Sequence, residues 1–307
     1  MPTARRWRRS TRSAFVFLTA LSACPAHAVT FMEFADPNPA SGNQFGAVAM
    51  PLSTGNVVIT SPFDDFGAGA VYLFDGATGA LISTLRGTNV GDNVGSGGVI
   101  ALRNGNFAVL SPNWQNGTAV GAGAITWVDG VLGLNGALTP SNSLVGPAAN
   151  NHVGSGGAVA LTNGFVVSSP QWDNGSLVDV GAVTRCNDAT VLNGTVSAVN
   201  SLIGGSTGDA VGSGGVRALT NGNYVVGSPS WNNGAVQDAG AVTWGNGLSG
   251  VKGMVTAANS LVGSSASDSV GILSHMAALT NGNYVIGTPT WNNGAVTDAG
   301  PPRGATA

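Results

Sequence analysis

Four tryptophans recur at one place in successive copies of a repeated phrase, and they are the first candidates for binding chemistry. Each follows a Ser/Thr-Pro-x step and precedes an x-Asn-Gly turn; they are Trp114, Trp172, Trp231 and Trp291. Indole rings present large apolar faces, so a row of such loops would contact glycans or surface proteins. The alternative is that each ring packs its own sheet against the next, and Phe63, which we expect at this place in the first copy, favours packing.

Two periodic sets of Asp and Asn residues are the second candidates. Asp and Asn at turns usually accept hydrogen bonds from the backbone two residues on, so we expect local capping. Weak binding of a divalent cation is the alternative. The first set, two residues before an opening valine, is Asp92, Asn151, Asp209 and Asp268, and the second is Asp179, Asp238 and Asp298.

Residues typical of catalysis are sparse in this chain. His152 and His275 fall at different positions of their copies, and neither has a recurring acid or nucleophile partner. No cluster of His, Cys and carboxylates has the spacing of a metal site. Cys186 interrupts one copy, which is typical of drift. We therefore predict no catalytic residue, no metal site and no cofactor, and a protein that is not an enzyme.

The first 28 residues are predicted to be a signal peptide. A basic segment with five arginines precedes a short apolar run, and Ala26-His27-Ala28 provides small residues for cleavage. A secreted or cell-surface protein is expected. A lipobox-like Leu21-Ser22-Ala23-Cys24 leaves the alternative of a lipoprotein anchored through Cys24. No stretch reaches the about 20 apolar residues of a transmembrane helix.

Composition favours short strands over helices and argues against nucleic acid. Glycine is 48 of 307 residues, too many for a helical protein. The leader takes five of the 11 basic residues and none of the 14 acidic ones, so the mature chain carries a net charge of −8. Contacts to phosphates need clustered Lys and Arg, which such a chain lacks.

A period of 58–59 residues organises the mature chain. The phrase VGSGGV or a variant opens at Val94, Val153, Val211 and Val270. Such periods indicate arrays, solenoids or propellers. We divide the chain into an N-terminal strand or tail (29–44), five units (45–93, 94–152, 153–210, 211–269 and an incomplete 270–300) and a non-repeat tail (301–307).

Each unit offers four strands separated by Gly-containing turns. In the fourth unit we expect strands at 216–219, 223–227, 241–244 and 254–257, with Asn221-Gly222 in the first hairpin. Sheets of this kind bury both faces by stacking. The sequence thus predicts an all-β, propeller-like array of four-stranded blades, as an open or truncated ring.

The last unit departs abruptly from the phrase. After Gly300 the chain reads PPRGATA, and Pro301-Pro302 removes two backbone donors where a third strand should begin. We therefore expect only two strands in this unit. Truncation of a longer array would explain this ending, and completion by strands from the N-terminal tail is the alternative.

The first unit resembles an FG-GAP repeat of the integrin-α propeller type. The resemblance lies in Phe45-Gly46, in the apolar strand that ends at Pro62 and in Gly67–Phe74. The later NGNYVVGSPxWNNG copies resemble a repeat of unknown function from large secreted bacterial proteins that are described as haemagglutinin- or adhesin-like. The resemblance implies a propeller and an adhesive role. The calcium loop D-x-D-x-D-G of FG-GAP blades is missing, so its Ca²⁺ sites are not carried over.

We expect an exported, non-enzymatic binding or adhesion module that contacts glycans or surface proteins through loops on one face. A structural spacer or remnant of a larger surface protein is the first alternative. A hydrolase on a propeller scaffold is the second, although its acids and histidines would not repeat.

Overall fold

Glycine turns divide the chain into short strands, as the sequence predicts. A computed structural model describes residues 32–300 and 303–305, and in this part the protein is all β apart from two single turns of helix. Both are too short to cross a membrane. The predicted signal peptide and Cys24 lie outside the described residues, so their processing stays a prediction.

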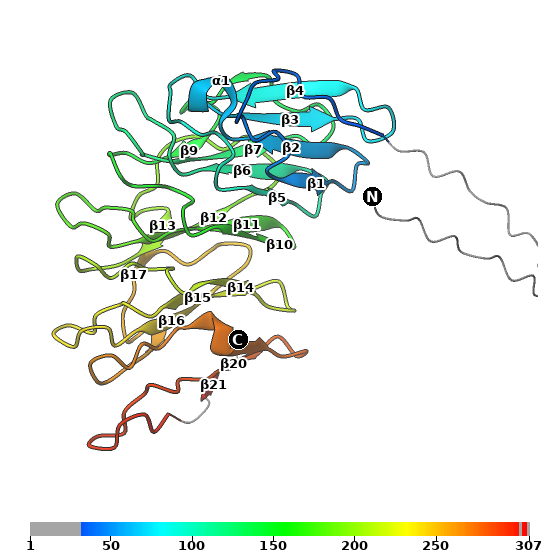
Figure 1. Cartoon of the computed structure of the whole chain (residues 1–307). Helices are drawn as coiled ribbons and strands as arrows, with labels where there is room; N and C mark the ends of the chain where they lie inside the picture. Colours follow the sequence, from blue (N-terminus) through cyan, green and yellow to red (C-terminus); the bar gives the residue numbers. More distant parts are fainter. Residues whose placement is uncertain (1–31, 301–302, 306–307) are drawn as a thin grey trace, which may run out of the picture. The chain divides into compact units, whose positions relative to one another are not determined.

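The strands form five sheets, one for each predicted unit, and they belong to one compact body that spans residues 34–307 (Figure 1). The first sheet has the order β1-β2-β3-β4-β8, the second β5-β6-β7-β9, the third β10-β11-β12-β13-β17, the fourth β14-β15-β16-β18 and the fifth β19-β20-β21. The bounds in the first two units are β1 Ala49–Pro51, β2 Val57–Ser61, α1 Asp64–Gly67, β3 Ala70–Phe74, β4 Leu81–Arg86, β5 Val99–Ala101, β6 Phe107–Ser111, β7 Ala124–Val128, β8 Gly136–Ala137 and β9 Leu144–Val145. Those in the later units are β10 Ala158–Leu161, β11 Gly164–Ser169, β12 Ala182–Cys186, β13 Ser201–Ile203, β14 Gly215–Ala218, β15 Tyr224–Ser228, β16 Ala241–Gly245, β17 Gly253–Met254, β18 Ser260–Val262, η1 (3-10 helix) Leu273–His275, β19 Met276–Ala278, β20 Tyr284–Ile286 and β21 Arg303–Ala305.

The first three strands of each unit form the predicted antiparallel meander. Gly222 turns the first hairpin of the fourth unit with φ +88°, a conformation that glycine adopts without steric cost. The predicted fourth strand at 254–257 is wrong. The fourth strand of this sheet is β18, whereas β17 pairs in parallel with β13 of the preceding sheet. Because this pairing joins two units, the local pattern of a single unit could not reveal it.

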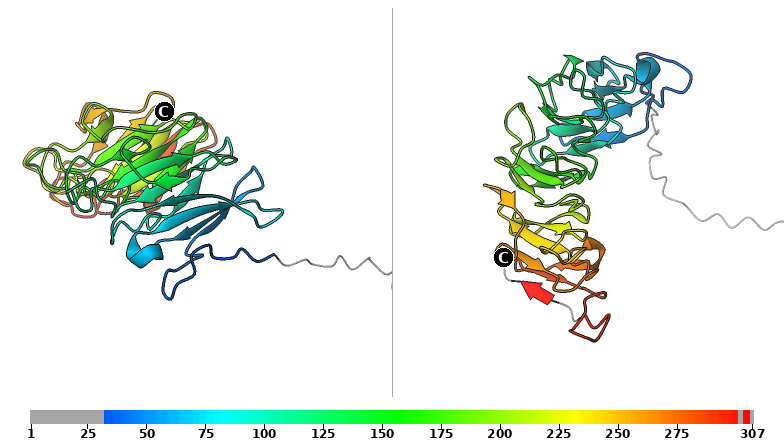
Figure 2. Two further views of the ribbon diagram at one scale, coloured as in Figure 1. Left: turned by 90° about the horizontal axis from the view of Figure 1, so that it is seen from above. Right: turned by 90° about the vertical axis from the view of Figure 1, so that its left-hand side faces the viewer.

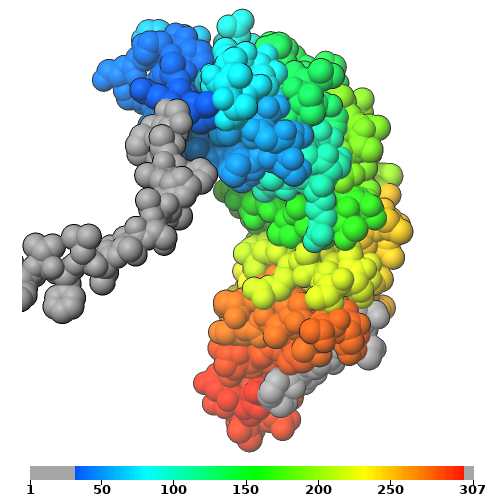
Figure 3. All heavy atoms as spheres, turned by 90° about the vertical axis from the view of Figure 1, so that its right-hand side faces the viewer, coloured from blue at the N-terminus to red at the C-terminus, as the bar shows by residue number. Residues whose placement is uncertain are grey.

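The sheets stack in sequence order, and each pair of neighbours shares an apolar cluster. Leu73 of the first sheet and Val109 of the second lie in one cluster, and Leu110 of the second and Val167 of the third lie in the next. Adjacent residues of a strand point to opposite faces, so the second strand of an internal sheet is buried on both sides. Figure 3 shows the same order on the surface, where colour follows the sequence from blue to red.

Backbone hydrogen bonds also join each unit to the one before it. The opening valine of units two to five donates its N–H to the preceding unit, for example Val153 to the Ala122 carbonyl at 3.1 Å. In the second and fourth units, the segment between the third and fourth strands holds β8 or β17 and makes a second bond to the preceding unit. The N–H of Leu138 donates to the Arg86 carbonyl, and the N–H of Val255 donates to the Ile203 carbonyl, each at 3.0 Å. Consecutive units are therefore joined by backbone hydrogen bonds as well as by apolar packing.

The two ends of the array differ. Phe34 and Phe45 cover the outer face of the first sheet, so the N-terminal segment does not complete the last unit. The prediction of two strands in that unit is wrong, since the short strand β21 pairs with β20 (Figure 2, right, red arrow). No apolar cluster among the described residues joins the first sheet to the last. The units therefore form an open array.

Candidate functional site

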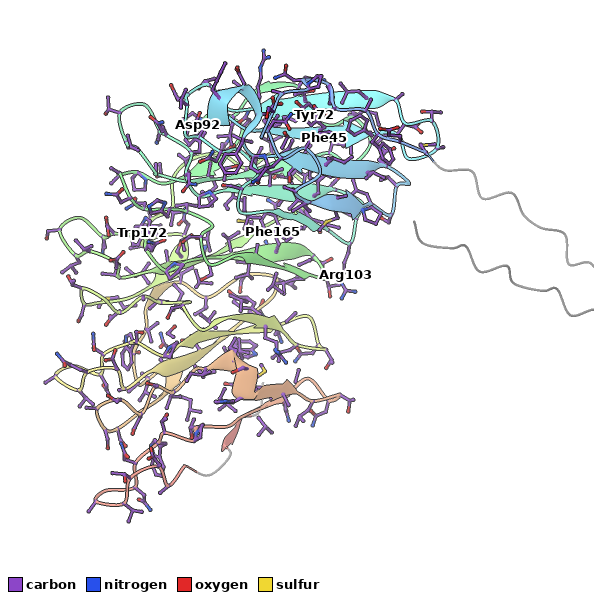
Figure 4. All side chains as sticks on the ribbon, in the orientation of Figure 1. Phe45, Tyr72, Asp92, Arg103, Phe165 and Trp172 are labelled. Atoms are coloured by element: carbon purple, nitrogen blue, oxygen red, sulfur yellow. The ribbon has the colours of Figure 1, made fainter. Side chains whose placement is uncertain are left out.

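The tryptophans of the internal repeats lie in the core. The side chains of Trp114, Trp172 and Trp231 are 4%, 3% and 5% exposed and belong to the clusters between successive sheets, while Trp291 is half-buried against the last one. Figure 4 shows Trp172 on the loop side of its sheet. Buried rings offer no stacking face, so any ligand contact at these loops would have to come from the exposed turn residues that follow.

Asp64, and not Phe63, takes the tryptophan position in the first unit. The Trp114 carbonyl accepts a hydrogen bond from Gly123 at 2.9 Å, and the Asp64 carbonyl accepts the matching bond from Gly69 at 2.9 Å. Asp64 is buried like the tryptophans, whereas Phe63 is 45% exposed. The expectation for Phe63 is wrong by one residue, because in Ser61-Pro62-Phe63-Asp64 the residue that follows the Ser-Pro-x step is Asp64.

The first set of Asp and Asn residues joins consecutive units through side-chain hydrogen bonds. Asp209 is buried; its Oδ2 accepts from the backbone N–H groups of Gly205 and Ser206, and its Oδ1 accepts from both nitrogens of Asn232. Asp268 and Asn292 repeat this arrangement. The expected bonds to local backbone are present, but the donors lie three and four residues before the acid and not two residues after it. A bond to the next unit is added that the sequence did not suggest.

One copy of this acid–amide pair is inverted. Asn151 stands where the other units have an acid, and its Nδ2 donates to Oδ2 of Asp173 at 3.2 Å. Asp173 in turn stands where Asn232 lies in the fourth unit. The exchange keeps one acid and one amide at the junction, so each buried acceptor still meets a donor.

The second set of acids occupies turns in a left-handed conformation. Asp179, Asp238 and Asp298 have φ of +51°, +50° and +51°, and their N–H groups donate to the side chain that follows the tryptophan, Asp173 in the first case. Gly121 fills the corresponding place in the second unit with φ +64°. Asp tolerates this conformation better than most residues, which explains the alternation with glycine.

The histidines and the cysteine form no cluster. His152 bonds the Pro112 carbonyl through Nδ1 at 3.0 Å, and His275 lies in the 3-10 helix. Burial raises the pKa of the Cys186 thiol to about 12. Within residues 32–300 and 303–305, no group of three or more His, Cys, Asp or Glu side chains could hold a metal ion.

The clearest candidate site is a pocket on the outer face of the first sheet, where this sheet departs from the repeat. A cavity of about 590 Å³ lies there, which we name the first-face pocket. Its lining side chains include Asp64, Asp65, Tyr72, Thr84, Arg86 and Asn135. Its size falls within the roughly 300–1,000 Å³ that is usual for small-molecule sites.

Four of the lining residues replace repeat residues at matching positions. Strand pairing aligns Tyr72 with Thr126 and its equivalents, Thr84 with Ser143, and Arg86 with Val145, while Asp64 replaces a tryptophan. In the internal sheets, Val145, Trp114 and their equivalents pack on the preceding sheet. On the first sheet the same positions line a cavity.

Asp64 is fixed at the base of the pocket by three donors. It accepts hydrogen bonds from the Tyr72 hydroxyl, from Nδ2 of Asn38 at 2.6 Å and from the N–H of Asp65 at 2.8 Å. Burial, and then the bond to Asp64, raise the pKa of Tyr72 above its usual range, so the phenol stays protonated and remains a donor. Tyr72 packs against Phe45 with ring centroids 5.8 Å apart (Figure 4).

Other lining groups are free to meet a ligand. Arg86 and Asp65 are exposed, and neither side chain has a hydrogen-bond or ion-pair partner among the described residues. Asn135 accepts from the Thr84 N–H through Oδ1 at 3.0 Å, which leaves its Nδ2 available. Asn135 lies just before β8, in the segment of the second unit between β7 and β9, so two units build the pocket.

The sequence carries a signal for this site. Compared with the internal copies, four changed positions in the first unit mark one face of one sheet. Asn38 and Asn135 had no such signal, because only the packing of distant segments brings them to the pocket.

Comparison with known families matches a repeat of unknown function (DUF5650) over residues 101–155, 160–213, 218–272 and 278–301. No curated protein matches the chain. The matches keep the period of our units but begin at residue 101, so strands β1–β4 lie outside them, whereas β8 and Asn135 lie within the first match. The likeness to FG-GAP repeats stays a prediction. Since the matches cover more than half of the sequence, the chain belongs to the family defined by the DUF5650 repeat.

Proposed function

We propose that this protein is an exported, non-enzymatic binding module that holds its ligand in the first-face pocket. The observation that carries the proposal is that Asp64, Tyr72, Thr84 and Arg86 surround one cavity. They replace a tryptophan and a valine that pack on the preceding sheet and a hydrogen-bonded Thr–Ser pair. A role in adhesion to glycans or proteins follows if the ligand is presented on a surface.

The internal repeats act as the scaffold in this proposal. Their periodic residues are engaged in packing or in junction hydrogen bonds, as shown by buried Trp172 and by the Asp209–Asn232 pair. The exposed turns after the tryptophans remain a second surface for weaker contacts.

A structural spacer is the second candidate, and the same engaged repeats favour it. A spacer needs only stacked units and no ligand. The two candidates differ in one respect, because only a binding module requires the pocket to be open.

Binding to an array of glycans and peptides tests the proposal, with the full chain lacking only its leader as the probe. Thr84 lines the pocket and is half-buried, so Thr84→Trp should block the cavity and abolish binding. Leu81→Trp, on the same strand but outside the lining and 45% exposed, is the matched control and should bind as the parent does. Binding that survives Thr84→Trp, or no binding at all by the parent, would leave the spacer.

A further inference from the structure

The groups that line the first-face pocket carry both signs of charge, and this restricts the ligand. The mature chain has few basic residues, yet Arg86 stands at this cavity without a partner. Asp65 lines the same cavity and is also unpaired, and no ion pair joins the two. Unpaired charges of opposite sign around one cavity are complementary to a ligand that itself carries both signs.

The fixed groups at the base strengthen this restriction. Asp64 is 3% exposed and is already held by Tyr72 and Asn38, so it contributes a negative field and little further bonding capacity. With two carboxylates against one guanidinium, a purely anionic ligand would be repelled. A purely cationic ligand would leave Arg86 unused and would lie beside a positive charge.

A neutral sugar is a poorer fit than a charged ligand. Tyr72 is the aromatic residue of the lining, and its side chain is 2% exposed, so it offers a hydroxyl and no open ring face. Carbohydrate sites that lack such a face must rely on hydrogen bonds alone. Arg86 instead provides the planar, bidentate donor that suits a carboxylate, and the free Nδ2 of Asn135 lies on the same cavity.

We propose that the first-face pocket binds a zwitterionic group, with its carboxylate on Arg86 and its ammonium on Asp65. An amino acid, or a residue that presents both charges at the end of a chain, has this chemistry. This inference rests on the proposed function and names the ligand class of the same pocket.

Isothermal titration of the full chain with charge-matched probes tests the inference. The probes are glycine, 4-aminobutyrate and 6-aminohexanoate, each compared with the alkylamine and the alkanoate of equal chain length. At least one zwitterion should bind about tenfold tighter than both of its singly charged counterparts, because a charge pair that the ligand shields from water is worth about a factor of ten. Equal binding of the amine and the zwitterion would overturn the inference.

Two variants assign the charges. Arg86→Gln should remove the preference for the zwitterion over the amine, and Asp65→Asn the preference over the alkanoate. Two matched controls should change neither preference. Arg103→Gln lies at an exposed turn of the second unit (Figure 4). Asp238→Asn lies at an exposed turn with φ +50°, close to the +46° of Asp65. Unchanged preferences in both pocket variants would contradict the assignment.

Thr84→Trp distinguishes a failure of the zwitterion inference from a failure of the proposed binding function. If glucose or another neutral probe binds and Thr84→Trp blocks it while no zwitterion binds, the ligand class is wrong and the binding module stands. If Thr84→Trp blocks no probe, both fail. Thermal unfolding of each variant shows whether the fold is retained.

Discussion

The outer face of the first sheet and the matching faces of the internal sheets share one backbone arrangement, but the first lines a cavity and the others pack on a neighbouring sheet. In the internal sheets, the position after Ser/Thr-Pro-x holds a tryptophan that packs on the preceding sheet. In the first sheet the same position holds Asp64, which is buried, accepts a hydrogen bond from Tyr72 and lines a cavity. A repeat backbone thus fixes where a side chain stands, and the side chain decides whether the position packs or binds.

The largest expected effect breaks the packing side of this comparison. Trp172→Ala should lower the free energy of unfolding by about 3–5 kcal/mol, because it leaves a cavity between the second and third sheets. Trp172→Phe should cost clearly less, since the buried indole N–H has no hydrogen-bond partner among the described residues. Urea unfolding followed by circular dichroism measures both.

Phe63→Ala is the control on the first sheet. Its side chain is 45% exposed, so the substitution should change stability by no more than about 0.5 kcal/mol. A cost for Phe63→Ala that equals the cost for Trp172→Ala would restore Phe63 as the counterpart of the tryptophans.

An intermediate effect tests the junction hydrogen bonds. Asn151→Asp places a second carboxylate against Asp173 and should cost about 1–3 kcal/mol, because the buried amide donor is lost. Adding Asp173→Asn recreates the order seen at Asp209 and Asn232 and should recover most of the loss. A double-mutant cycle by urea unfolding measures this coupling, and simple additivity of the two costs would show that the pair is not a unit.

The smallest expected effect concerns the pH dependence of stability in the third sheet. Burial raises the pKa of Cys186 to about 12, so the folded state holds the thiol proton more tightly than the unfolded state. The corresponding stability is present below the unfolded thiol pKa of about 8.5 and is lost as the pH rises from there toward the folded value.

Cys186→Val removes this titration and keeps the packing, since Val128 fills the same place in the second sheet. At neutral pH the change should stay below about 1 kcal/mol. Between pH 8 and about 10.5 the urea midpoint of the parent should fall more steeply than that of the variant. Parallel slopes would show that the thiol is not the group that titrates.

Much of the fold could be predicted from local patterns. Gly-containing turns set the first hairpin of each unit, and the strand expected at 223–227 corresponds to β15, whose residues are all buried. The strand β17 could not be predicted, because Gly253 and Met254 pair with another unit. The strand β21 was missed because Pro301-Pro302 argues against a strand at that point, and the chain pairs just beyond it.

The candidate site was harder to predict, for a physical reason. Periodicity draws attention to recurring residues such as Trp231, and these recur because packing requires them in every unit. A site present once leaves no periodic signal. It is marked instead by the departures at Asp64 and Arg86, which stand where the internal units have a tryptophan and a valine.

Hydrogen–deuterium exchange of the full chain, with and without the tightest ligand from the binding array, tests the central claim most directly. The account predicts that the ligand slows amide exchange in segments 64–72, 84–87 and 135–136, and leaves the turns after Trp114, Trp172 and Trp231 unchanged. Protection confined to those turns, with none on the first sheet, would contradict the account and place binding on the repeats.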